Sequence, residues 1–145
     1  MTLRHFIFAF AVAVLVAGCG SGPVKRITPP AVSIQQLVAA PDGNWHVTLR
    51  VQNYSTVAMR YSALHVALHI AGVDVGTLDL KPDLDIPPNS ADVVDGTLHA
   101  SAKLPPGDLE YRITGTIDTS EPKDNFKVDR SSRLSPAPGL PGTWR

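Results

Sequence analysis

The chain has 145 residues, with 13 Lys and Arg against 13 Asp and Glu, so its formal net charge is zero. This balance argues against a basic stripe for nucleic acid and against a polybasic patch for anionic lipid, so we expect no nucleic-acid partner. The chain has one cysteine, which excludes an intrachain disulfide and leaves the apolar core to hold the fold.

Residues 1–18 are typical of a secretory signal peptide. Arg4 supplies a cationic start, residues 6–16 are an unbroken apolar run, and small residues follow up to Gly18. A membrane-spanning helix needs roughly 20 apolar residues, so this run is too short to be a span. We therefore expect the chain to be cleaved between Gly18 and Cys19.

Cys19 directly follows the apolar run, and the tetrapeptide Val16-Ala17-Gly18-Cys19 resembles the lipobox of bacterial lipoproteins. The resemblance implies that the Cys19 thiol receives a diacylglyceryl group, that palmitate-type chains anchor the protein in the membrane, and that Cys19 becomes the new N-terminus. In Gram-negative members an Asp at the next position retains the protein at the inner membrane, so Gly20 implies an outer-membrane lipoprotein facing the periplasm. A plain secretory signal with an incidental cysteine is the alternative. A catalytic thiol is disfavoured, because Cys19 lies in a Gly- and Ser-rich stretch rather than in a His-bearing pocket.

The rest of the chain divides into three parts by composition. Residues 19–30, the lipidated Cys19 and a Gly-, Ser- and Pro-containing stretch, are predicted to form a flexible tether. Residues 135–145 contain three prolines and two glycines, and we expect a disordered tail there. The folded domain is then residues 31–134.

Apolar residues in this domain recur with a period of two, which is typical of strands with one buried face. The clearest alternation runs from Leu109 to Asp118, and it is as regular over residues 45–52 and 63–70. Trp45 and Tyr111 fall on the apolar faces and are predicted to be core or rim aromatics. Weaker candidate strands are Val32 to Leu37, Val73 to Leu80, Ala91 to Ala100 and Phe126 to Arg130.

Turn-forming residues separate these seven segments, for example Pro41-Asp42-Gly43 and the four residues 105–108. Seven short strands with such spacing predict an all-β fold, most simply a β-sandwich. A small barrel is the alternative.

Four short motifs lie within residues 31–130: Val51-Gln52-Asn53-Tyr54-Ser55, Arg60 to Leu64, Ala71 to Gly76, and Ile86-Pro87-Pro88-Asn89-Ser90. Together they resemble the late embryogenesis abundant (LEA) type-2 domain, also called the water stress and hypersensitive response (WHy) domain. In that family one strand ends in Asn-Pro, whereas here Tyr54 stands in place of the proline. The resemblance implies a seven-stranded immunoglobulin/fibronectin-III-like β-sandwich, no cofactor, and an association with desiccation or other stress.

Three residues of these motifs also have a local role in turns. Asn53 can close an Asx-turn where the chain leaves the strand before it. Gly72 can supply the positive φ of a tight hairpin. Pro87 belongs to the Ile-Pro loop that precedes a further strand in the family.

The chain offers little for metal binding. His65 and His69 share one face of a predicted strand, but four residues at about 3.4 Å each place them roughly 13 Å apart. We therefore expect solvated or paired histidines, with His69 facing Asp74 across the hairpin. Five aspartates crowd residues 79–95 without the spacing of a calcium loop, which favours a solvated loop and strand edge.

Motifs for catalysis are also missing from the sequence, including a Gly-x-Ser-x-Gly elbow, a phosphate loop and a His-Glu-x-x-His pair. We therefore expect no enzyme activity, no cofactor and no small-molecule substrate. Two functions remain open. One is a stress-protective lipoprotein held at the membrane by its lipid anchor, and the other is an accessory module that docks on an envelope protein through a sheet edge or loop face.

Overall fold

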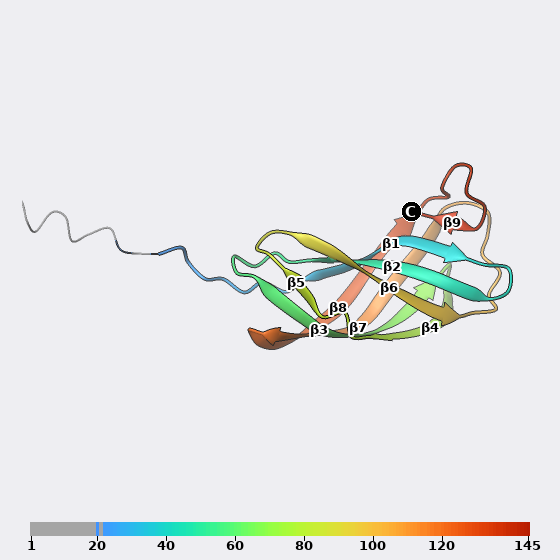
Figure 1. Cartoon of the computed structure of the whole chain (residues 1–145). Helices are drawn as coiled ribbons and strands as arrows, with labels where there is room; N and C mark the ends of the chain where they lie inside the picture. Colours follow the sequence, from blue (N-terminus) through green and yellow to red (C-terminus); the bar gives the residue numbers. More distant parts are fainter. Residues whose placement is uncertain (1–19, 21) are drawn as a thin grey trace, which may run out of the picture.

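The chain folds into two antiparallel sheets packed face to face, as the computed structural model shows (Figure 1). The structure describes Gly20 and residues 22–145, so the predicted signal peptide and Cys19 lie outside the described residues. One sheet has the strand order β6-β2-β1-β9 and the other β4-β3-β7-β8, with β5 paired to β3 beside them. The strands are β1 (Ala31–Ala39), β2 (Asn44–Gln52), β3 (Met59–Ile70), β4 (Val73–Leu80), β5 (Leu84–Ile86), β6 (Ala91–His99), β7 (Leu109–Glu121), β8 (Lys123–Leu134) and β9 (Thr143–Trp144).

The all-β sandwich is confirmed, but the described part of the chain has nine strands rather than seven. All seven predicted segments are strands. The two additional ones, β5 and β9, have three and two residues, which is too short for an alternating pattern to be visible. No helix in residues 22–145 has the length and apolar character needed to cross a bilayer.

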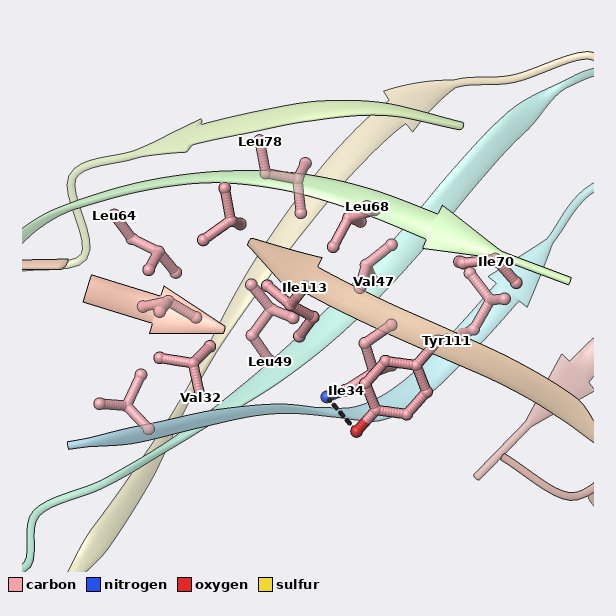
Figure 2. Packing of buried hydrophobic residues seen from close by; sticks show 14 of the residues in the cluster. Val32, Ile34, Val47, Leu49, Leu64, Leu68, Ile70, Leu78, Tyr111 and Ile113 are labelled. Atoms are coloured by element: carbon pink, nitrogen blue, oxygen red, sulfur yellow. Dashed lines mark hydrogen bonds between the residues drawn. The ribbon is translucent and has the colours of Figure 1, made fainter. Parts of the chain in front are cut away.

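The core forms between the sheets from the alternating residues of the long strands. Every second residue of β2 from Trp45 to Val51 is buried, and the same holds for β3 from Leu64 to Ile70. Figure 2 shows side chains of both sheets directed into the space between them, among them Leu49, Leu68 and Ile113. Each large apolar side chain removed from water contributes roughly 1.5–3 kcal/mol, so this set supplies the main driving force for folding.

Tyr111 of β7 connects the two sheets through the core. Its ring is buried, and its hydroxyl accepts a hydrogen bond of 3.2 Å from the backbone N–H of Ile34 on β1 (Figure 2). The register of β1 against β2 shifts between Ile34 and Gln36, and a buried N–H at such an irregularity needs a partner. Tyr111 and Trp45 are thus core aromatics, as predicted.

The disordered tail predicted over residues 135–145 needs correction. Thr143–Trp144 forms β9, which pairs with Leu37 and Val38 of β1. The Trp144 side chain is 8% exposed, and its indole N–H donates a 2.9 Å hydrogen bond to the carbonyl oxygen of Gly107. The prolines and glycines therefore form the turns that bring the chain back to β1, and burial of Trp144 stabilises this arrangement.

Gly115 lies in the middle of β7, where a Cβ atom would be 2.0 Å from the carbonyl oxygen of His65. Gly115→Ala should lower the free energy of unfolding by about 3 kcal/mol, because β3 and β7 would have to separate. Gly76→Ala is the matched control, since Gly76 also has a positive φ but no atom within 4 Å of the added Cβ, and it should cost about 1 kcal/mol. Chemical denaturation measures both, and equal losses would contradict the close approach of the two strands.

Candidate functional site

Two of the three motif residues lie together at one end of the sandwich. We call this the tether end: it consists of residues 22–30, the β2–β3 loop (residues 53–58) and the β5–β6 loop (residues 87–90). In Figure 1 the chain enters there, beside β5. Asn53 and Pro87 are at this end, whereas Gly72 is at the opposite end, in the β3–β4 hairpin.

Asn53 is fully buried, with 0% exposure, and all its side-chain polar atoms are bonded. Its amide nitrogen donates to the carbonyl oxygens of Val57 at 2.9 Å, Ile86 at 3.0 Å and Pro87 at 3.1 Å. Its Oδ1 atom accepts the N–H of Ser55 at 2.8 Å, which closes the Asx-turn expected here. One side chain therefore joins the β2–β3 loop to the β5–β6 loop.

The flexible tether predicted over residues 19–30 also needs correction, because its second half is bonded to the β2–β3 loop. The N–H of Thr28 donates to the hydroxyl of Ser55 at 2.9 Å. The N–H of Thr56 donates to the carbonyl oxygen of Arg26 at 2.9 Å, and the hydroxyl of Thr56 accepts the N–H of Arg26 at 2.7 Å. The same hydroxyl donates to the carbonyl oxygen of Val24 at 2.8 Å. Composition alone did not reveal these partners, since they lie about thirty residues further along the chain.

Gly72 forms the tight hairpin expected between β3 and β4. Ala71 has φ of 52° and Gly72 has φ of 76°, so both central residues of this two-residue turn are left-handed. Such a turn matches the twist of the flanking strands, and glycine adopts it without steric cost. This accounts for Gly72 by backbone geometry.

The histidines of β3 each face an aspartate of β4. His69 Nε2 lies 4.0 Å from Asp74 Oδ2, which is the predicted cross-strand pair. His65 Nδ1 lies 2.6 Å from Asp79 Oδ1, a second pair that the sequence analysis missed although the strand register implies it. Within residues 22–145, no three His, Cys, Asp or Glu side chains are close enough to hold a metal ion.

The aspartates of residues 79–95 do not converge on one point. Asp83 and Asp85 share Arg60, whereas Asp79 and Asp95 have partners elsewhere. Asp83 binds Arg60 in a bidentate pair, with N–O distances of 2.9 and 3.1 Å. Asp95 of β6 accepts a 2.6 Å hydrogen bond from the hydroxyl of Thr48, its partner on the adjacent strand β2. Elsewhere on the same sheet as Arg60, Arg112 of β7 binds Asp129 of β8 in the same bidentate way at 3.0 Å.

These arginine pairs shift the titration of their carboxylates. Hydrogen bonds from Arg60, helped by its charge, lower the pKa of Asp83 below the ordinary 3.8. Hydrogen bonds from Arg112 lower the pKa of Asp129 in the same way. Both pairs are exposed, so their effect on stability is small and is screened by salt.

An apolar groove of about 650 Å³ lies at the end opposite the tether. It forms where the C-terminal residues return to the β6–β7 loop, and its walls include Pro105, Pro106, Pro136, Leu140, Pro141 and Trp144. The groove was not predicted, because the prolines and glycines of residues 135–145 indicated a disordered tail. The one signal in the sequence was Trp144, a large aromatic residue in an otherwise Pro- and Gly-rich segment.

The fold is similar to several solved structures. A solution structure of a protein from Arabidopsis thaliana has a TM-score of 0.52 and 12% identity, over 81% of this chain and 85% of that one. A solution structure of a candidate late embryogenesis abundant (LEA) protein has a TM-score of 0.48 and 10% identity, over 97% and 87% of the two chains. A crystal structure of a protein from Archaeoglobus fulgidus has a TM-score of 0.43 and 14% identity, over 76% and 98%. No protein-family model and no curated protein matches the sequence. At 12% identity, the likeness to the Arabidopsis structure concerns the fold alone.

Asn53→Ala should lower the free energy of unfolding by about 3 kcal/mol, because it removes the donors of three carbonyl groups and the acceptor of a buried N–H. Asn53→Asp should cost at least as much, since it keeps the acceptor for Ser55 but turns a carboxylate toward the carbonyl oxygens. Asn125→Ala is the control at an exposed position, where the amide binds Asp118, and its effect should stay within about 0.5 kcal/mol. Equal effects of Asn53→Ala and Asn125→Ala in urea denaturation would contradict this role.

The lowered pKa values of Asp83 and Asp129 predict a small acid-dependent loss of stability. A depressed pKa contributes stability above the ordinary value of 3.8, and this contribution disappears as the pH falls through the folded-state pKa. Replacing Arg60 and Arg112 by Gln should therefore flatten the fall in melting temperature between about pH 5 and pH 2, mainly at low salt. Arg50→Gln is the control, since that guanidinium donates to the Gln52 amide, and an equal flattening there would argue against the two pairs.

Proposed function

We propose that this protein is a non-enzymatic bacterial envelope lipoprotein that protects the envelope during desiccation or related stress. In this proposal Cys19 carries the lipid anchor, and the sandwich faces the periplasm from the outer membrane. The observation that carries the proposal is the position of Cys19: it follows a short apolar run and precedes an all-β domain whose first strand begins at Ala31. Two or three acyl chains would make attachment stable, because each buried methylene contributes about 0.8 kcal/mol.

The pairing of the polar side chains supports a function without turnover. Arg60, Arg112 and His65 of the second sheet each face a nearby aspartate, and the pairs lie apart from one another on an open surface. A catalytic site would instead bring such groups together in a cleft that excludes water. Contact between this near-neutral, rigid surface and envelope components is the mode of action that we propose.

The LEA type-2 assignment is supported by what the motif residues do at the tether end. Asn53 and Pro87, from motifs 34 residues apart in the chain, meet in one buried hydrogen-bond network. The family-like motifs thus have a shared structural role in this fold, beyond being isolated turn formers. The similarity to the Arabidopsis structure supports the fold of this assignment but carries no functional argument.

The second candidate function is docking on an envelope protein. The apolar groove favours it, because it lies at the end of the sandwich opposite the tether end, where it is open to a partner. A stoichiometric partner recovered with the tagged protein from membranes, and lost with Leu140→Asp, would favour this second function.

A deletion strain tests the stress role directly. Without the protein, cells should survive drying or hyperosmotic shock less well than the parent strain. The wild-type gene should restore survival, whereas Cys19→Ala should fail to do so because the domain would leave the membrane. Replacing His65, His69 and His99 together by Gln should restore survival normally, since we assign these histidines no ligand.

Equal survival of the deletion and parent strains would contradict the stress role. Recovery of the wild-type protein in the soluble periplasmic fraction would contradict the anchor. Failure of the folded triple-histidine variant would indicate a metal or catalytic site.

A further inference from the structure

The tether end exposes apolar side chains beside two cations. In the described part of the chain six large hydrophobic residues are exposed, and three of them belong to this end: Val24 at 75%, Ile27 at 45% and Tyr54 at 53%. Lys25 and Arg26 lie between the first two and are also exposed. We call these five residues the tether-end patch.

Hydrogen bonds join the two chain segments that carry the patch. Thr56 binds the backbone of Val24 and Arg26, and Ser55 binds Thr28. Tyr54 directly precedes this pair of loop residues, and the loop itself is held by the buried Asn53. The exposed side chains on the incoming chain and on the β2–β3 loop are therefore displayed from a fixed backbone.

The distance from the anchor limits where this surface can be. Val24 is five positions beyond Cys19 in the sequence, and a fully extended chain over five positions spans at most about 18 Å. The headgroup region of one leaflet is roughly 5–8 Å thick. If acyl chains on Cys19 hold the protein, Val24 therefore lies at most about 13 Å from the membrane surface.

We propose that the tether-end patch is a membrane-contact surface that lies on the headgroups of the bilayer holding the Cys19 anchor. This inference rests on the proposed anchoring and adds an orientation to it: the Asn53 end faces the bilayer and the apolar groove points away. Burial of Val24 and Ile27 in the interface removes apolar surface from water, and the amphipathic ring of Tyr54 suits the headgroup level. Lys25 and Arg26 add attraction to anionic headgroups.

Fluorescent labels at the two ends of the full-length lipidated protein test this orientation. The anchor consumes the thiol of Cys19, so an introduced cysteine is the only free thiol in residues 19–145. One label is attached through Ala58→Cys in the β2–β3 loop and the other through Val73→Cys at the opposite end; both positions are exposed. The protein is placed in vesicles of phosphatidylethanolamine and phosphatidylglycerol that carry a quencher on the headgroup. The label at residue 58 should be quenched and the label at residue 73 should not.

Substitution of the patch should release the tether end from the membrane. With Val24, Ile27 and Tyr54 all replaced by Ser, quenching at residue 58 should fall to the level measured at residue 73. The matched control replaces Val73 and Leu140 by Ser, because these side chains are 47% and 48% exposed at the opposite end, and it should leave quenching at residue 58 unchanged. Unchanged denaturation midpoints would show that both variants keep the fold.

The outcomes separate this inference from the anchoring itself. Vesicle flotation of the wild type with no quenching at either label would overturn the orientation and leave the anchor intact. Equal quenching at both labels would also overturn it, since the domain would then lie flat on the bilayer. Failure of the wild type to float would contradict the anchor, and the orientation with it.

Discussion

A buried primary amide needs partners for both its N–H groups and its oxygen, and at Asn53 these partners come from two loops that are far apart in sequence. The β2–β3 loop carries the chain from one sheet to the other, and the β5–β6 loop carries it back. By bonding to both, Asn53 fixes the two crossings at the same end of the sandwich. The hydroxyl groups of Ser55 and Thr56 are then positioned to hold the incoming chain.

Residues 22–30 connect the Asn53 network to the proposed anchor at Cys19. A chain that became ordered only at Ala31 would leave the domain free to rotate at some distance from its anchor. Since Val24, Arg26 and Thr28 are bonded to the β2–β3 loop, the ordered body instead begins within five residues of Cys19. If Cys19 carries the proposed anchor, this short and bonded attachment gives the domain a defined side toward the membrane. Tyr54, at the position where the LEA type-2 family usually has proline, becomes part of that side.

The long strands were predictable because the physical pattern that identifies them is local. Alternation over β2, β3 and β7 placed Trp45, Leu68 and Ile113 on the buried face, and a packed core requires this. The Asx-turn of Asn53 was predictable for the same reason, since its acceptor and donor are two residues apart. The carbonyl groups of Ile86 and Pro87 were not, because they are more than thirty residues away and meet Asn53 only after the sheets pack.

The C-terminal residues show the opposite limit of sequence reasoning. Proline and glycine indicate that a segment is not regular, but they do not distinguish disorder from a turn held by one buried side chain. Trp144 supplies that side chain here.

The surroundings of the two core tyrosines also depend on residues far away in the sequence. The hydroxyl of Tyr111 has the Ile34 N–H as its partner, whereas that of Tyr61 is buried without a partner among the described residues. Burial raises the pKa of Tyr61 to about 12.

The most direct measurement is the mass of the N-terminal peptide of the protein extracted from membranes. Our account predicts a peptide that begins at Cys19 and carries a diacylglyceryl group on sulfur, because every later step depends on an anchor at that residue. An unmodified peptide that begins at Cys19 or elsewhere in the mature chain, or one that retains Met1, would contradict the account.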